Sequence, residues 1–180
     1  MSTLKTNLIQ TTGGKTLLQS TGSILQIVQY GYSAVYENTT ANSEYDMPGV
    51  LGDGTASINP INASSRILFS AVMHCGQEDT WRGNFFRTYY KIGSGSWTQF
   101  NGGFAQINYV ASYNGLMNSV TTEFLLTSLN TTSTVYFKIT QTGHANGGYL
   151  HLNQNNTTNS TTANNTVLTT STITLKEISA

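Results

Sequence analysis

Short segments in which apolar and polar residues alternate recur from residue 24 onward, and this pattern most limits the folds open to the chain. In the clearest segment, "RILFSAVMH", apolar side chains occupy every second position: Ile67, Phe69, Ala71 and Met73. Because successive side chains of a strand point to opposite faces, this period of two predicts a strand with one buried face.

Comparable segments follow at fairly regular spacing, and none of them is a convincing helix. Turn sequences such as "GSGSW", "NGGF" and "NGLMN" separate them, and "STITLKEI" closes the chain with Ile173 and Leu175 on one face. Many short strands divided by turns are typical of antiparallel sandwiches and barrels. We therefore expect an all-β fold, an antiparallel β-sandwich of eight to ten strands that is jelly-roll-like by strand count.

The composition predicts a surface that is polar but almost uncharged. Thr, Asn and Ser make up about 65 of the 180 residues, whereas charged residues make up 9% and balance at eight basic and eight acidic. Such a surface cannot neutralise a phosphate backbone, so we expect no nucleic-acid partner. No stretch approaches the roughly 18 consecutive apolar residues of a membrane span, so we expect no membrane partner.

Residues 1–23 form a polar segment ahead of the first apolar strand, and residues 24–180 carry the strands of the expected sandwich. The stretch "TTGGKT" resembles the end of a phosphate-binding loop, but Ile9 stands where the pattern G-x-x-x-x-G-K-[ST] needs its first glycine. We therefore expect no nucleotide cofactor, and interpret residues 1–23 as an extended N-terminal arm. The sequence also lacks the pattern of a signal peptide, which favours synthesis in a reducing cytoplasm.

Residues 41–65 form a long segment between two predicted strands. It holds both prolines and three glycines, and a loop of this length is usually functional or packed on a neighbour. Its acidic residues Glu44, Asp46 and Asp53 fail the EF-hand spacing, because Thr55 stands where a bidentate glutamate is required. We assign no metal site, although a less regular calcium site in this loop stays open.

No catalytic motif is present, so we expect a protein that is not an enzyme and has no cofactor. His74 and Cys75 are adjacent and would face opposite sides of a strand, which prevents a nucleophile–base pair. His144 and His151 lack the further ligands of a metal site. Trp97 follows a glycine–serine turn, where an aromatic ring can stack on a sugar; the alternative is that it covers one edge of the core.

The segment "NFFRTYYKI" carries aromatic residues on both faces of a predicted strand. The first face, suited to the core, holds Phe86, Thr88, Tyr90 and Ile92. The second face holds Phe85, Arg87, Tyr89 and Lys91. Because aromatic residues and arginine are enriched in interfaces, we expect the second face to be buried between the subunits of a homotrimer. The alternative is that residues 41–65 cover it within one chain.

Three segments resemble virion surface proteins of tailed bacteriophages, of the marine-phage type: "LKTNLIQTTGGKTLLQSTGSILQIVQ", "SSRILFSAVMHCG" and "STITLKEISA". The resemblance implies a jelly-roll head, often trimeric, on a capsid or a tail fibre, and it supplies no catalytic residues. It also implies that the arm docks on a neighbouring subunit or the shell. The arm residues that would make this contact are Leu4, Leu8, Ile9, Lys15, Leu17 and Leu18.

The expected function is that of a non-enzymatic virion structural protein that decorates or cements a capsid surface. Its partners would be the major capsid protein or other virion proteins, with assembly in the host cytoplasm. Two alternatives stay open at this point. One is the receptor-binding head of a tail fibre, which would contact a glycan of the host surface. The other is a carbohydrate-binding module.

Overall fold

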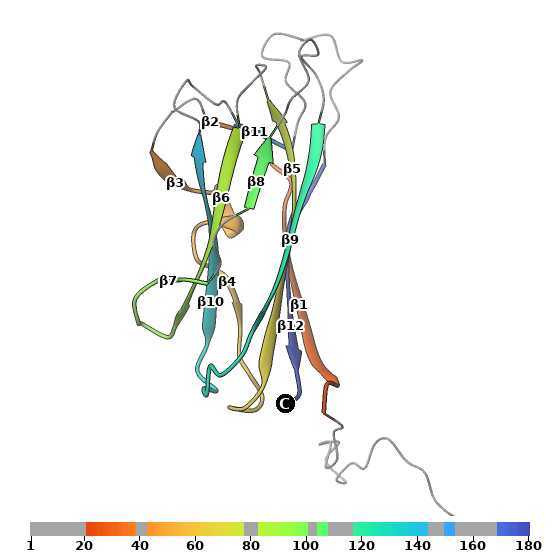
Figure 1. Cartoon of the computed structure of the whole chain (residues 1–180), viewed down its shortest axis with the longest axis vertical. Helices are drawn as coiled ribbons and strands as arrows, with labels where there is room; N and C mark the ends of the chain where they lie inside the picture. Colours follow the sequence, from red (N-terminus) through yellow and green to blue (C-terminus); the bar gives the residue numbers. More distant parts are fainter. Residues whose placement is uncertain are drawn as a thin grey trace, which may run out of the picture.

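The structure is a computed structural model that describes residues 21–38, 43–77, 83–100, 104–107, 117–143, 150–153 and 169–180. Within these ranges the chain forms two six-stranded antiparallel sheets that face each other (Figure 1). The first sheet contains β1 (Ile24–Tyr32), β2 (Tyr36–Asn38), β5 (Arg66–Gln77), β9 (Met117–Leu126), β11 (Leu150–Leu152) and β12 (Ser171–Ile178). The second sheet contains β3 (Glu44–Asp46), β4 (Ala56–Ile58), β6 (Gly83–Ile92), β7 (Thr98–Gln99), β8 (Phe104–Ile107) and β10 (Val135–Gly143).

The strand order is that of a jelly roll. Strands β11 and β12 lie end to end along one edge of β5, with β2 and β1 end to end beside them. In the same way β3 and β4 share β10, and β7 and β8 share β6. Counted as one strand each, these four pairs leave eight strands. Numbered along the chain, they run 1-8-3-6 in the first sheet and 2-7-4-5 in the second.

The fold class predicted from the alternating pattern is therefore confirmed. The twelve strands within the described ranges exceed the expected eight to ten because four jelly-roll strands are each split in two. The first apolar strand after residue 23 is interrupted at residues 33–35, between β1 and β2. There the Asn153 side-chain amide donates hydrogen bonds to the carbonyls of Tyr32 (2.7 Å) and Ala34 (3.0 Å). This side chain replaces the neighbouring strand as the partner of both carbonyls.

The hydrophobic core lies between the sheets and is built from every second residue of the long strands. The predicted inward residues of β5 are all buried: Ile67, Phe69, Ala71 and Met73. Phe69 stacks on Phe137 of β10 with ring centroids 5.5 Å apart, and Phe100 contacts Phe69 edge-on at 5.3 Å. These contacts join the two sheets directly.

The segment 41–65, predicted as a loop, contributes to both the sheet and the core. It contains β3, the short 3₁₀-helix η1 (Gly49–Leu51) and β4, and both strands pair with β10. Met47, Leu51 and Ala56 are buried within it. The sequence does not reveal these strands, because each is only three residues long and lies among glycines and prolines. Each strand depends on pairing with β10.

Glu177 in β12 connects the end of the chain to the segment before β5. Its buried carboxylate accepts hydrogen bonds from the backbone N–H groups of Ile61 (2.8 Å) and Asn62 (3.2 Å) and from the Gln26 amide (2.6 Å). Burial by itself raises the pKa of Glu177, but these hydrogen bonds outweigh it and leave the pKa below its usual value. The ionised form is thus favoured by folding.

We predict that Glu177→Gln destabilises the domain at pH 7 by about 1–3 kcal/mol, because the buried donors lose a charged acceptor. A carboxyl whose pKa is lowered by folding stabilises the native state above its unfolded pKa of about 4.3, and this contribution is lost as pH falls through the folded pKa. Urea unfolding at pH 7 and pH 3 should therefore show a difference from wild type that shrinks in acid. Glu37→Gln, at an exposed position, is the control; an unchanged difference at both pH values would contradict this account.

Candidate functional site

The outer face of the second sheet gathers most of the charged and aromatic side chains that the sequence singled out. Strand β6 pairs with β10 so that Arg87 is opposite Thr140 and Tyr89 is opposite Lys138. Strand β3 lies on the other side of β10 and brings acidic residues to the same face. Side chains from three strands can therefore meet there, although they are far apart in the sequence.

Glu44 of β3 is the centre of a hydrogen-bonded group on this face. Its Oε1 accepts hydrogen bonds from the hydroxyls of Tyr89 (2.7 Å) and Thr140 (2.5 Å), and its Oε2 pairs with Arg87 Nη1 at 2.8 Å. Burial by itself raises the pKa of Glu44, but the hydrogen bonds from Thr140 and Tyr89 and the charge of Arg87 outweigh it and leave the pKa below its usual value. Burial is the main cause that raises the pKa of Tyr89, and the hydrogen bond to the Glu44 carboxylate and its charge add to this rise.

A second ion pair lies beside the first. Lys138 Nζ contacts Asp46 Oδ1 at 2.6 Å and lies 5.1 Å from the ring centre of Trp97 and 5.7 Å from that of Tyr89. Lys91 Nζ also lies over the Trp97 ring, at 4.8 Å. Cation–π contacts of this kind hold the indole ring in place on the sheet.

Trp97 is seated against the segment that follows η1. Gly54 has φ +77°, and a Cβ at this position would lie 2.8 Å from Trp97 Cζ2. The backbone conformation and the close approach both require glycine. The tryptophan is thus fixed between Gly54 and the lysines rather than free on a flexible turn.

These residues surround an open hollow of about 350 Å³. Its walls are formed by side chains of β3, β10 and β6 together with Trp97, which precedes β7. Its lining residues are Glu44, Tyr45, Asp46, Tyr89, Trp97, Lys138 and Thr140. We call it the outer-face hollow. A volume of this size is within the range of small-molecule sites.

The four residues predicted to form the subunit interface differ in their surroundings. Phe85 is 42% exposed, whereas Arg87 and Tyr89 contact Glu44 of the same chain and Lys91 lies over Trp97 and Tyr136. Part of this face is therefore covered by residues 41–65, as the alternative interpretation held. The interface itself stays a prediction, with Phe85 as its most exposed member.

The three loop carboxylates considered for calcium have separate partners. Glu44 and Asp46 form ion pairs with Arg87 and Lys138, while Asp53 Oδ1 accepts hydrogen bonds from the backbone N–H (2.8 Å) and hydroxyl (2.6 Å) of Thr55. Across the described ranges, no group of three or more His, Cys, Asp and Glu side chains could hold a metal ion.

His74 and Cys75 face opposite sides of β5. Cys75 is buried in the core, and His74 Nδ1 lies 2.9 Å from Ser119 Oγ on the other face. His151 is buried. The arm residues Leu4, Leu8, Ile9, Lys15, Leu17 and Leu18 lie outside the described residues, as does His144.

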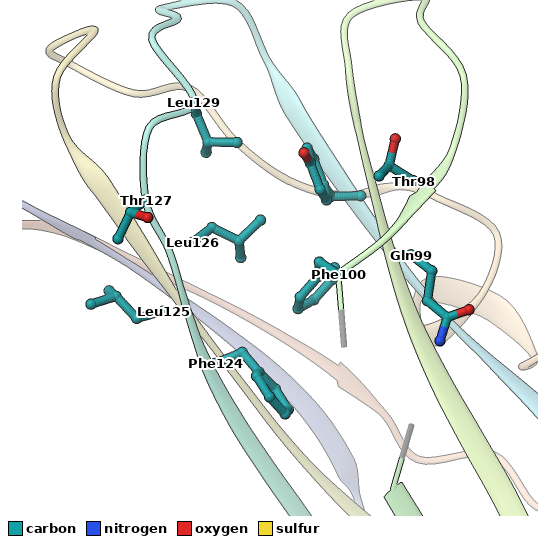
Figure 2. Close-up of a pocket in the computed structure, with 9 residues that line it drawn as sticks. Thr98, Gln99, Phe100, Phe124, Leu125, Leu126, Thr127 and Leu129 are labelled. Carbon is teal, nitrogen blue, oxygen red and sulfur yellow. The ribbon is translucent and has the colours of Figure 1, made fainter. Parts of the chain in front are cut away.

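A second hollow, of about 250 Å³, opens between β9 and the segment around β7 (Figure 2). Phe100, Phe124, Leu126 and Leu129 line it, with Thr98 and Thr127 nearby. Among the described residues, those that line it carry no Asp, Glu, His, Lys or Arg side chain. In the described parts of the chain, no helix is long and apolar enough to cross a membrane.

Comparison with known protein families and with curated proteins finds no match to the sequence. Among solved structures, the chain is similar to the VP2 subviral particle of infectious bursal disease virus, with 10% identity and a TM-score of 0.44 over 100% of this chain and 42% of that one. The structure of the Gx strain of this virus gives 12% identity and a TM-score of 0.43 over 93% and 39%.

The chain spans about two fifths of the length of these viral chains. With TM-scores below 0.5, the two likenesses carry no argument about function, and the jelly-roll assignment rests on the strand order itself. The tailed-phage resemblance in the sequence stays a prediction.

Sequence reasoning missed the part of the site that β10 and β3 supply. Lys138 and Thr140 alternate with the buried Phe137 and Ile139 in "TVYFKITQT", and this period of two is the signal that could have identified them as outward residues. It did not identify their partners, because Asp46 and Glu44 lie more than 90 positions earlier in the sequence.

We predict that Cys75 does not react with thiol reagents in the native protein. Burial raises its pKa to about 12, so the thiolate that reacts is almost absent at pH 8. Titration with a disulfide reagent should give no thiol in the folded protein and one per chain in denaturant. Rapid labelling of the folded protein would place Cys75 in an accessible position and reopen the question of catalysis.

Proposed function

We propose that this chain is a non-enzymatic structural protein of a virus particle, which decorates the capsid surface as a homotrimer. The observation that carries the proposal is the complete jelly-roll strand order, in which two sheets pack face to face. Only 9% of the residues of this chain are charged. The tailed-phage resemblance of three sequence segments supports the same assignment. The buried thiol and the mutually paired charges support a role without catalysis.

Trimer formation is supported by Phe85. This aromatic residue lies near the start of β6, is 42% exposed, and is opposite Thr142 on the outer face, two residues from Arg87. Aromatic residues and arginine are enriched in protein interfaces. An assembly with closed cyclic symmetry would suit a cap on a symmetric shell.

We predict that Phe85→Ser converts the trimer to monomers. Truncation of an interface anchor costs about 2 kcal/mol or more, which weakens association roughly 30-fold. Sedimentation equilibrium should show the mass fall to that of one 19.5 kDa chain while the β-sheet circular dichroism persists. Tyr89 is left intact because its hydroxyl bonds Glu44 within the chain.

Leu125→Ser is the matched control for the trimer test. Leu125 is 45% exposed but lies on β9 in the other sheet, so its replacement should leave the trimer intact. A Phe85→Ser protein that stays trimeric would place the interface elsewhere. Dissociation of the Leu125→Ser protein would place it on the first sheet.

We predict that deletion of residues 1–20 leaves the domain folded but abolishes attachment to particles. The fold should persist because Gly22 N–H donates to the Ser179 carbonyl (3.0 Å) and Ser179 N–H donates to the Ser23 carbonyl (2.8 Å), both beyond the deletion. Occupancy is measured by cryo-electron microscopy of particles mixed with purified protein. A glycine–serine arm of equal length is the control and should also fail. Wild-type occupancy after deletion would contradict the arm's docking role.

A further inference from the structure

We infer that the outer-face hollow binds a neutral pyranose sugar, with Trp97 against its C–H face and Asp46 and Lys138 on its hydroxyls. This inference is independent of where the protein sits on a virus particle. It depends on the shape, charge and hydrogen-bonding groups of the hollow.

The lining of the hollow combines aromatic rings with charged side chains that form hydrogen bonds. Small-molecule sites are largely apolar or aromatic, with a few placed polar groups that fix orientation. Here Tyr89 and Trp97 supply aromatic surface, while Asp46 and Lys138 supply an acceptor and a donor 2.6 Å apart. A pyranose ring presents the same combination, since it has a C–H face and a rim of hydroxyls that both donate and accept.

Four charged side chains at the hollow form two neutral pairs. Lys138 neutralises Asp46, and Arg87 neutralises Glu44, at distances of 2.6 and 2.8 Å. At either pair, a charged ligand would compete with an oppositely charged side chain that is already in place. The whole chain also has a formal net charge of zero, so no long-range field attracts ions. A ligand without charge is therefore favoured.

The position of Lys138 disfavours a cationic ligand held by the aromatic rings. Rings such as Tyr89 and Trp97 can form a cage for a quaternary ammonium group. In this protein the Lys138 ammonium lies over both rings, at 5.7 and 5.1 Å. The chain's own cation thus fills that role, which favours an uncharged ligand.

The Asp46 carboxylate keeps hydrogen-bonding capacity for a ligand. A carboxylate offers about four acceptor sites, and Lys138 takes one of them at Asp46 Oδ1. The Asp46 side chain is 55% exposed, so hydroxyls can reach it from solvent. Adjacent sugar hydroxyls can then donate to Asp46 and accept from Lys138.

The test is saturation-transfer NMR and calorimetry of the full chain with three neutral probes: methyl β-D-glucopyranoside, methyl β-D-galactopyranoside and methyl α-D-mannopyranoside. We expect at least one to bind at millimolar concentration, with saturation strongest at its ring C–H protons. Trp97→Ala should weaken this binding about tenfold, because the stacking surface is lost. Asp46→Asn should weaken it about threefold while it preserves shape, because charge-assisted hydrogen bonds are stronger than neutral ones.

Tyr136→Ala is the matched control, since Tyr136 contacts Lys91 on the same face but does not line the hollow. The affinity of the Tyr136→Ala protein for the sugar should equal that of wild type. Trp97→Phe serves if the alanine variant fails to fold, and should lie between wild type and full loss. Absence of binding at tens of millimolar, or binding unchanged in Trp97 and Asp46 variants, would overturn the inference. Tighter binding of N-acetylneuraminic acid or choline would overturn the neutral class.

Discussion

The stacked contact between Phe69 and Phe137 links the two sheets directly within their shared hydrophobic core, and the rest of the structure depends on this core. Each ring belongs to a long strand with partners on both sides, so a single stacked pair at 5.5 Å couples β5 and β10 and, through them, most of the backbone ladder. Phe100 joins the pair edge-on and extends it toward β7. Buried aromatic pairs combine large apolar area with a preferred geometry, so they fix the relative position of the sheets as well as their separation.

Strand β10 carries the core on one side and the outer-face hollow on the other. Because its side chains alternate, fixing Phe137 and Ile139 in the core also fixes Lys138 and Thr140 outside. A shift of one residue in the pairing with β6 would exchange the two sets, exposing Phe137 and burying Lys138. The register that packs the core is therefore the register that builds the site.

The same alternation explains how much the sequence could predict. It identified the inward faces of β5 and β12 and the jelly-roll class, because those strands are long and their partners are equally regular. It also drew attention to Trp97 and to Tyr89. It did not predict β3 and β4, whose three residues each give too short a pattern and which form only through pairing with β10. The pairing of Glu44 with Arg87 was likewise hidden, since it depends on strand order rather than local sequence.

The ion pairs on the outer face add little net stability, and this points to what they do. Solvent screens ion pairs that are partly exposed, and such pairs typically contribute about 0–1 kcal/mol, so apolar residues of similar volume would hold β3 to β10 as well. Lys138 is only 16% exposed and lies between Asp46 and two aromatic rings. The arrangement differs from an apolar contact in one respect: it leaves hydrogen-bonding groups, fixed in direction, beside aromatic surface at an open hollow. A polar site without net charge is the consequence, and it is one that a neutral chain rich in Thr, Asn and Ser can present without attracting ions.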